Sequence, residues 1–413
     1  MSKKILMCFA SVFLAANIFF AQENHKVSVV NIEIPVRVFE GNQFVDTLTM
    51  DDFEIYENGV LQKPSALYLT EKAQIIRQDL KHQIQPELGR QFCFLFQMTE
   101  YSPRIREGMD YFFNNIFRPG DSILLVTPLK QYTLSPKALE IKSREDLVQD
   151  ITKVIRKDTQ FGSSEYNSAI IDLKRIVSTV SSMTGGQQTM YQTSIDTSSA
   201  DSMGPDDLIH LLPNYRETLE KLESMRIVDE ENFLAFASHL KSLSGQKIVF
   251  LFYQREFRPE LNPSTMNRLI SNNQANVALL NQLQDLFQVY HRDLNINIDR
   301  MKQVFADSSL MLNLMFFNKS PEDIPGVVMR EQSEDLYRIF SELAQSTGGI
   351  VNTAQNPASA LKTASDIADK CYLLYYSPTH DLADDQFKNI EVEVKGNNYK
   401  VFYREGYFQV QSK

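Results

Sequence analysis

Continuous apolar runs alternate with longer amphipathic segments through the middle of the chain. The runs are FCFLF (92–96), SILLVTPL (122–129), KIVFLFYQ (247–254), LMLNLMFFN (310–318) and CYLLYYS (371–377). A short apolar run is typical of a strand that is covered on both faces. Between the first two runs, Ile105, Met109 and Phe112 recur on one side of a predicted helix. The pattern predicts an α/β fold, with a mostly parallel, doubly wound sheet over residues 91–378.

The two ends of the chain have the pattern of half-buried β structure instead. Within residues 22–72, apolar and polar side chains alternate, and Asn58-Gly59 is a strong signal for a tight hairpin turn. Residues 73–90 form a polar linker, and residues 384–413 predict a C-terminal β-hairpin. Neither β segment is large enough to bury a core alone. We therefore predict that these small antiparallel segments flank the α/β domain and meet as one β-sandwich.

Residues 262–306 are polar overall and helical in pattern, and we interpret them as a helical insertion in the α/β domain. Apolar side chains recur in them at helical spacing: Leu269, Leu279, Leu280, Leu283, Leu286 and Phe287. Such a stripe is typical of core that docks on the parent domain. A partner-binding helix is the alternative interpretation.

The first 21 residues have the pattern of a signal peptide. Lys3 and Lys4 precede an apolar run, and Ala21 offers a small residue for cleavage before Gln22. A retained N-terminal anchor is the alternative, although the run is short for a span of about 20 residues. No later run is long enough to span a bilayer. We expect an exported protein, periplasmic or extracellular, with no membrane span after signal removal.

Charge and cysteine content narrow the choice of partners. The chain of 413 residues has 42 basic and 52 acidic side chains, and removal of residues 1–21 leaves 40 basic residues and a net charge of −12. This acidic balance argues against nucleic acid as a partner. Without the signal, the cysteines are Cys93 and Cys371, both within apolar runs. We expect two free buried thiols, because separate strands of one sheet do not bring cysteines within disulfide distance.

Several stretches, in order along the chain, resemble the von Willebrand factor type A proteins that some bacteria export. They are LTMDDFEIYENGVLQK, IFRPGDSILLVT, LAQSTGGIV and CYLLYYSP with FKNIEVEVKG and YKVFYREGYF. The resemblance implies a Rossmann-like domain with a metal-ion-dependent adhesion site at the carboxyl ends of its strands. Three loops of that site supply Asp-x-Ser-x-Ser, a Thr and an Asp, which hold Mg²⁺ for a partner's carboxylate.

At the matching positions, this sequence has lost both acids. Gln97 stands in place of the first Asp and Gln254 in place of the last, while Tyr101 replaces the second Ser. Mg²⁺ prefers anionic oxygen ligands and gives up water reluctantly, so neutral side chains predict a degenerate site that holds no metal. The expected binding residues are Gln97, Thr99, Glu100, Ser163, Ser164 and Gln254.

These residues favour a non-enzymatic protein that binds a protein partner through this top face, without a cofactor. One alternative is a metal-dependent adhesin in which Glu100 and Glu165 act as substitute carboxylates for Mg²⁺. Another is a hydrolase with an unrecognised site, although the sequence contains no nucleophile elbow and no phosphate-binding loop.

Overall fold

Six strands form the central sheet of the protein, in the order β14–β12–β10–β7–β8–β9. Four of the pairings are parallel, and the edge strand β9 is antiparallel to β8. The strands are β7 (Arg90–Gln97), β8 (Ser122–Val126), β9 (Gln131–Leu134), β10 (Gln246–Gln254), β12 (Leu310–Phe317) and β14 (Val351–Asn352). The computed structural model describes residues 31–82, 84–134, 136–183, 205–226, 229–290, 296–378, 386–396 and 398–408. The predicted signal peptide, residues 1–21, lies outside these ranges.

Helices cover both faces of this sheet, which explains the continuous apolar runs. On one face lie α2 (Arg104–Tyr111), η2 (Phe112–Ile116), α3 (Pro136–Ile141), α4 (Arg144–Gly162) and α12 (Pro357–Asp369). On the other lie α7 (Glu230–Lys241), α10 (Ile298–Asp307) and α11 (Glu334–Ser346). Successive strand residues point to opposite faces, so Phe94 enters the first core and Cys93 the second. The predicted mixed α/β fold is confirmed.

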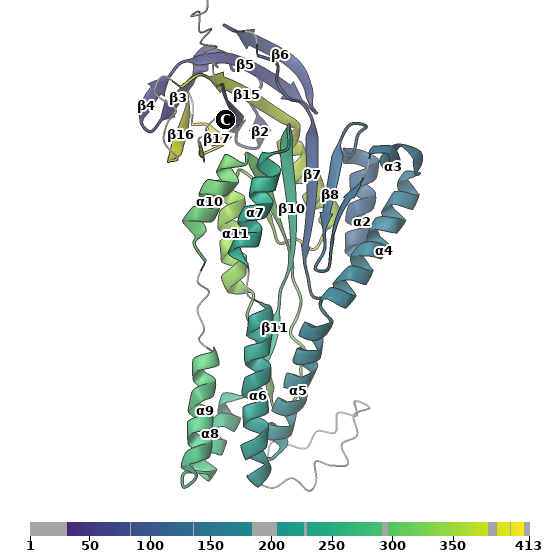
Figure 1. Ribbon diagram of the computed structural model, residues 1–413, viewed down its shortest axis with the longest axis vertical. Coiled ribbons are helices and arrows are strands. Elements are labelled where there is room, and N and C mark those ends of the chain that lie inside the picture. Colours follow the sequence, from purple (N-terminus) through teal and green to yellow (C-terminus); the bar gives the residue numbers. More distant parts are fainter. Residues whose placement is uncertain are drawn as a thin grey trace, which may run out of the picture.

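A β-sandwich caps the amino ends of the parallel strands (Figure 1). One sheet has the order β17–β1–β15–β5–β6, with β2 beside β1, and the other has the order β18–β16–β3–β4. The strands are β1 (Ile32–Glu40), β2 (Gln43–Phe44), β3 (Phe53–Glu57), β4 (Val60–Gln62), β5 (Pro64–Glu71), β6 (Gln74–Leu80), β15 (Lys370–Tyr376), β16 (Phe387–Val394), β17 (Lys400–Tyr403) and β18 (Gly406–Phe408), with a short helix η1 (Met50–Asp52) before β3. Because β1 pairs with β17 and β3 with β16, the predicted meeting of the two chain ends is confirmed. The predicted C-terminal hairpin over residues 384–413 is divided between the two sheets, because β16 pairs with β3 and β18 while β17 pairs with β1.

The sequence placed two segments wrongly at this junction. β15, predicted as the last strand of the parallel sheet, pairs antiparallel with β1 and β5 in the sandwich. Its run is continuous because Tyr372 enters the sandwich core while Cys371 is buried on the outer face. A strand buried on both faces has the same pattern in either sheet. Part of the predicted linker 73–90 is also strand β6.

The two cysteines are free and buried, as predicted, but the reason differs from the expected one. Cys93 lies in the central sheet and Cys371 in the sandwich, so they belong to different sheets. Burial raises the pKa of the Cys93 thiol to about 12, which keeps it protonated at neutral pH.

A helical arm extends from the carboxyl ends of the central strands, away from the sandwich (Figure 1). It consists of α5 (Ser164–Met183), α6 (Pro205–Met225), α8 (Pro263–Asn272) and α9 (Val277–Tyr290), with the antiparallel pair β11 (Phe257–Leu261) and β13 (Val327–Glu331). Its own core includes Leu269, Leu279, Leu283 and Leu286. These four residues of the predicted stripe are therefore core, packed against α5 and α6, whereas Leu280 is half-buried and the Phe287 side chain lies outside the described residues.

The predicted insertion 262–306 is only partly correct. α8 and α9 belong to the arm, whereas α10 packs on the central sheet through Met301 and Phe305. α5 and α6, which the sequence did not separate from the α/β domain, also belong to the arm. Apolar spacing shows that a helix has a buried face, but it does not show which core receives that face.

The arm begins where α4 ends. A Cβ atom at Gly162 would lie 2.8 Å from the Pro128 Cβ, so only glycine allows this close approach. In the part of the chain that the structure describes, every helix is too short or too polar to cross a lipid bilayer.

Candidate functional site

The carboxyl ends of β7, β10 and β12 lie side by side, because these strands are parallel and in register. Tyr253 of β10 is opposite Gln97 of β7, and Gln254 is opposite Phe317 of β12. The segments that follow these strands meet the start of α5 at what we call the carboxyl edge. In open α/β sheets this edge is the usual place for a ligand.

Two predicted site residues join the loops at this edge instead of facing solvent. Gln254 is 8% exposed, and its Oε1 accepts a hydrogen bond of 3.2 Å from the backbone N–H of Glu100. Ser163 is buried, and its hydroxyl donates to the carbonyl oxygen of Met98 at 3.1 Å. These two neutral side chains therefore hold the loops together directly.

The structure brings only some of the predicted residues to one place. Thr99 and Glu100 line a cavity of about 40 Å³ at the edge. Gln97 is exposed at the end of β7, and Ser164 is exposed and donates to the carbonyl oxygen of Phe161 within its own turn. Gln97, Ser163, Ser164 and Gln254 do not line the cavity. Binding of a partner by the six predicted residues stays a prediction.

Most walls of this cavity come from residues that the sequence reasoning missed. Among them are Tyr166, Asn167 and Lys174 of α5, Arg255 and Glu256 after β10, and Lys319 and Glu322 after β12. The available signal was the charge that directly follows each apolar run, as in FLFYQREF and LMFFNKSPED. No local sequence pattern predicts that residues of α5 line the cavity, because this depends on the direction in which the helix leaves the sheet.

Ion pairs cross the carboxyl edge and connect the loop after β12 to its neighbours. Lys319 is paired with Glu100, and Lys174 Nζ lies 2.7 Å from Glu322 Oε1. Asn167 Nδ2 also donates to the Thr99 carbonyl oxygen at 3.2 Å. These contacts present both signs of charge on the surface, with Glu100 and Glu322 about half exposed.

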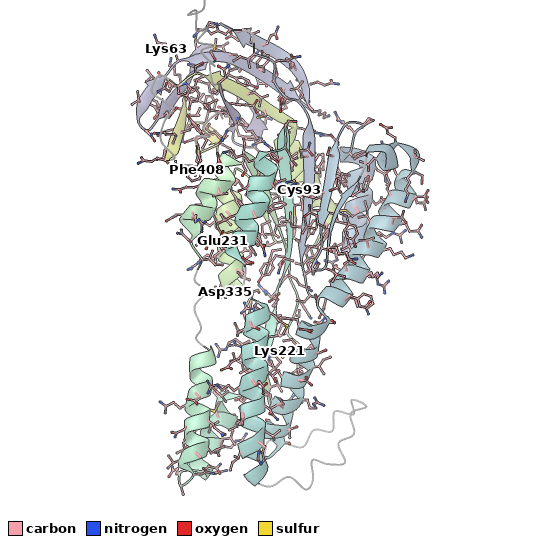
Figure 2. The ribbon with its side chains drawn as sticks, viewed as in Figure 1. Lys63, Cys93, Lys221, Glu231, Asp335 and Phe408 are labelled. Carbon is pink, nitrogen blue, oxygen red and sulfur yellow. The ribbon has the colours of Figure 1, made fainter. Side chains whose placement is uncertain are left out.

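A buried ionic cluster lies beneath the edge, at the root of the arm. Arg226 contacts Glu223 at 3.1 Å, Glu256 at 3.4 Å and Asp335 at 3.2 Å. Arg258 contacts Glu223 at 2.7 Å and Glu260 at 2.6 Å. The charges come from α6, the β10–β11 connection, β11 and the start of α11, and Figure 2 labels Asp335 at this junction. The cluster fixes the arm to the central sheet.

Burial dominates the electrostatics of this cluster. It raises the pKa of Glu256 to about 7, although the neighbouring Arg226 guanidinium acts to lower it. It also raises the pKa of Tyr253, whose hydroxyl is buried and has no hydrogen-bond partner among the described residues. Glu256 therefore changes its charge near neutral pH.

The residues at the carboxyl edge do not fit the Mg²⁺ that the family resemblance implies. The side chains at the ligand positions are neutral, and Gln254 Oε1 and the Ser163 hydroxyl are already engaged within the protein. Glu100 is paired with Lys319, and Glu165 is exposed. Across the described residues, no three His, Cys, Asp or Glu side chains are grouped so as to hold a metal ion.

Comparisons with known proteins give little further information. No family model and no curated protein matches the chain. Among solved structures, it is similar to an aerotolerance-related membrane protein from Bacteroides fragilis, at 8% identity over 68% of this chain and 98% of that chain, with a TM-score of 0.24. It is similar to the TFIIH p34 N-terminal domain at 8% identity over 67% and 96% of the two chains, with a TM-score of 0.20.

A third similarity is to the human COPII-coat protein Sec24c, at 6% identity over 78% of this chain and 44% of that chain, with a TM-score of 0.27. TM-scores this low do not establish a shared fold. The architecture of the protein therefore rests on its own strand pairings.

Proposed function

We propose that this chain is an exported, non-enzymatic binding protein whose central unit is a doubly wound, von Willebrand A-type domain. It engages a protein partner at the carboxyl edge of the sheet, beside the helical arm, and it does so without a metal ion. The strand order, the antiparallel edge strand and the helices on both faces support the A-type assignment.

The hydrogen bond from the Glu100 N–H to Gln254 Oε1 carries the metal-free part of this proposal. In the metal-dependent family members, two loops are joined through an ion, and the partner completes its shell. Here a neutral amide joins the same loops, so recognition falls to the exposed side chains around the cavity. Glu100, Lys319 and Glu322 present paired charges there, which suits a protein surface with complementary charge.

The test is affinity capture in which the mature chain is the bait and the envelope fraction of its own cells is the source of partners. The capture is done once in EDTA and once in Mg²⁺. Capture of the same protein in both buffers is expected. Lys319→Glu places a third acid beside Glu100 and Glu322 and should abolish that capture. Lys63→Glu is the matched control, because Lys63 is an exposed lysine of the sandwich (Figure 2), far from the edge.

Capture that requires Mg²⁺ and is lost in Glu100→Ala would favour the metal-dependent adhesin over this proposal. Turnover of a substrate, abolished by one substitution, would favour a hydrolase. Export is tested separately by N-terminal sequencing of the protein from cell fractions. A start at Gln22 in the periplasmic or extracellular fraction is expected, and a chain that starts at residue 1 in the membrane fraction would indicate an anchor.

A further inference from the structure

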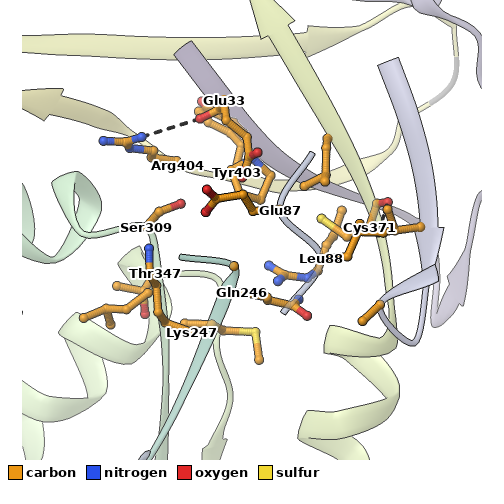
Figure 3. Close-up of a pocket in the computed structure, with 18 of the residues that line it drawn as sticks. Glu33, Glu87, Leu88, Gln246, Lys247, Ser309, Thr347, Cys371, Tyr403 and Arg404 are labelled. Carbon is orange, nitrogen blue, oxygen red and sulfur yellow. Dashed lines mark hydrogen bonds between the residues drawn. The ribbon is translucent and has the colours of Figure 1, made fainter. Parts of the chain in front are cut away.

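A second cavity, of about 80 Å³, lies at the opposite end of the central sheet, between that sheet and the sandwich. Its walls include the first residues of β10 and β12 and the outer face of β1 and β15 (Figure 3). Glu87, Gly89 and Glu405 are exposed lining residues and form its mouth. The cavity is separate from the carboxyl edge, so it is independent of the proposed partner site.

Two buried cations line this cavity from opposite domains. Arg37 of β1 is 5% exposed and Lys247 of β10 is 8% exposed. The Arg37 Nε has no hydrogen-bond partner among the described residues. In the same ranges, no hydrogen bond or ion pair to the Lys247 side chain is found. A buried charge without a hydrogen-bonded partner is costly, so two of them at one cavity need an explanation.

The other charged groups of the cavity are already engaged or lie at its mouth. Arg404 donates to the Asp307 carbonyl oxygen at 2.7 Å, and Asp369 lies 3.4 Å from Arg90. Glu33 accepts a hydrogen bond from the Tyr375 hydroxyl, and burial raises its pKa. Burial also lowers the pKa of Lys247. The Glu33, Glu87 and Asp307 carboxylates act to raise the pKa of Lys247, but no hydrogen-bond acceptor is found among the described residues for the Arg37 Nε or the Lys247 ammonium.

The remaining walls set the size and polarity of a ligand. Pro35, Leu88, Leu310, Met311 and Leu373 supply apolar surface. At 10–15 Å³ for each water-sized group, the cavity has room for about five to eight such groups. Glu33 and Glu87 disfavour a second negative charge on the ligand, which argues against a phosphate dianion.

We infer that this interdomain cavity binds a short aliphatic monocarboxylate. Its two oxygens accept from the Arg37 guanidinium and the Lys247 ammonium, and its alkyl chain lies against the apolar wall. A guanidinium matches the planar geometry of a carboxylate, and removal from water strengthens both interactions. Because the ligand touches both domains, its binding also stabilises the contact between the sandwich and the central sheet.

Calorimetry on the mature chain tests this inference with propionate, butyrate, propionamide and inorganic phosphate as probes. Saturable heat with propionate or butyrate is expected. At least tenfold weaker binding is expected for propionamide, which lacks the charge, and for phosphate. Phosphate that binds more tightly than both carboxylates would overturn the assignment of the ligand class. No saturable heat with any probe would leave water as the occupant and overturn the inference.

Lys247→Met should weaken carboxylate binding at least tenfold, whereas Lys63→Met, at an exposed lysine of the sandwich that does not line the cavity, should leave it unchanged. Arg37→Gln is a second variant, used if Lys247→Met fails to fold. Carboxylates should also raise the thermal midpoint of the wild type and lose this effect in either cavity variant. Equal affinity in a folded cavity variant and in the wild type would overturn the inference.

Discussion

The two ends of the central sheet differ in whether their buried cations have hydrogen-bonded carboxylate partners. At the carboxyl end, Arg226 and Arg258 are almost fully buried, and each contacts two or more carboxylates. At the amino end, Arg37 and Lys247 are as deeply buried, but no hydrogen-bonded counter-ion is found for them in the described residues. The difference separates a cluster that stabilises the fold from a cavity that is prepared for a ligand.

The largest expected effect is at the carboxyl end. Arg226→Met leaves Glu223, Glu256 and Asp335 without their shared cation, and it should lower the free energy of unfolding by about 3–5 kcal/mol. Urea denaturation with a structural probe measures this loss. Arg37→Met is the matched variant at the amino end. Without ligand it should cost less than about 1 kcal/mol or stabilise the protein, because it removes a buried charge whose Nε has no hydrogen-bond partner among the described residues. Equal losses in both variants would remove the distinction between the two ends.

The next effect concerns pH at the carboxyl end. The pKa of Glu256 is raised from 4.5 to about 7 in the folded protein, so the folded state holds this proton more tightly than the unfolded state. The free energy of unfolding should therefore fall as pH rises from about 4.5 to about 7, by about 3 kcal/mol for this group. Below about pH 4.5, Glu256 is protonated in both states and its burial costs no stability through ionisation. Above about pH 7, the full cost of ionising the buried carboxyl is present.

Glu256→Gln isolates that contribution. Urea denaturation of the variant and the wild type at pH 4.5, 6, 7 and 8 gives the difference in stability at each pH. The free energy of unfolding of the variant, relative to that of the wild type, should increase as pH rises. This difference should stay constant above about pH 8. A difference that does not change with pH would show that folding does not raise the pKa of Glu256.

A smaller effect is expected for the hydrogen bond between the Glu100 N–H and Gln254 Oε1. Gln254→Ala removes the acceptor of the Glu100 N–H and should lower the free energy of unfolding by about 1–2 kcal/mol. Gln97→Ala is the control, since Gln97 is exposed and its replacement should stay within about 0.5 kcal/mol. Hydrogen exchange at the Glu100 amide should accelerate in the first variant alone. Unchanged exchange there would contradict the role given to Gln254.

The smallest effect is at the surface of the same edge. Lys174→Met breaks the ion pair with Glu322, which is 51% exposed, and should cost less than about 1 kcal/mol. The cost should shrink further in high salt, because exposed pairs are screened. A loss as large as that of Arg226→Met would place this pair within the buried cluster.

Much of the fold was predictable from local pattern. Continuous apolar runs marked the buried strands, and the Asn58-Gly59 turn occurs between β3 and β4, with positive φ at both positions. The meeting of the chain ends followed from the small core that each could bury. β15 could not be assigned, because burial on both faces gives the same pattern in a sandwich as in a parallel sheet.

The candidate sites were predictable to different degrees. The sequence placed neutral side chains, Gln97 and Gln254, at the ends of two strands. Their roles differ, since Gln97 is exposed and Gln254 holds two loops together. The ion pairs of Lys319 and Lys174 join residues more than 100 positions apart. No local pattern encodes such a pairing.

The sequence by itself determined which apolar runs are buried and which side chains at the carboxyl edge are neutral, because these properties depend on residue type and spacing. The tertiary structure decided that β15 joins the sandwich, that α5 and α6 build an arm, and that Arg37 and Lys247 face one cavity. Those outcomes depend on which surfaces meet across long separations in the chain. The physical reason is that an apolar surface can be buried against several other surfaces of the chain. Only the assembled protein shows which of these surfaces it packs against.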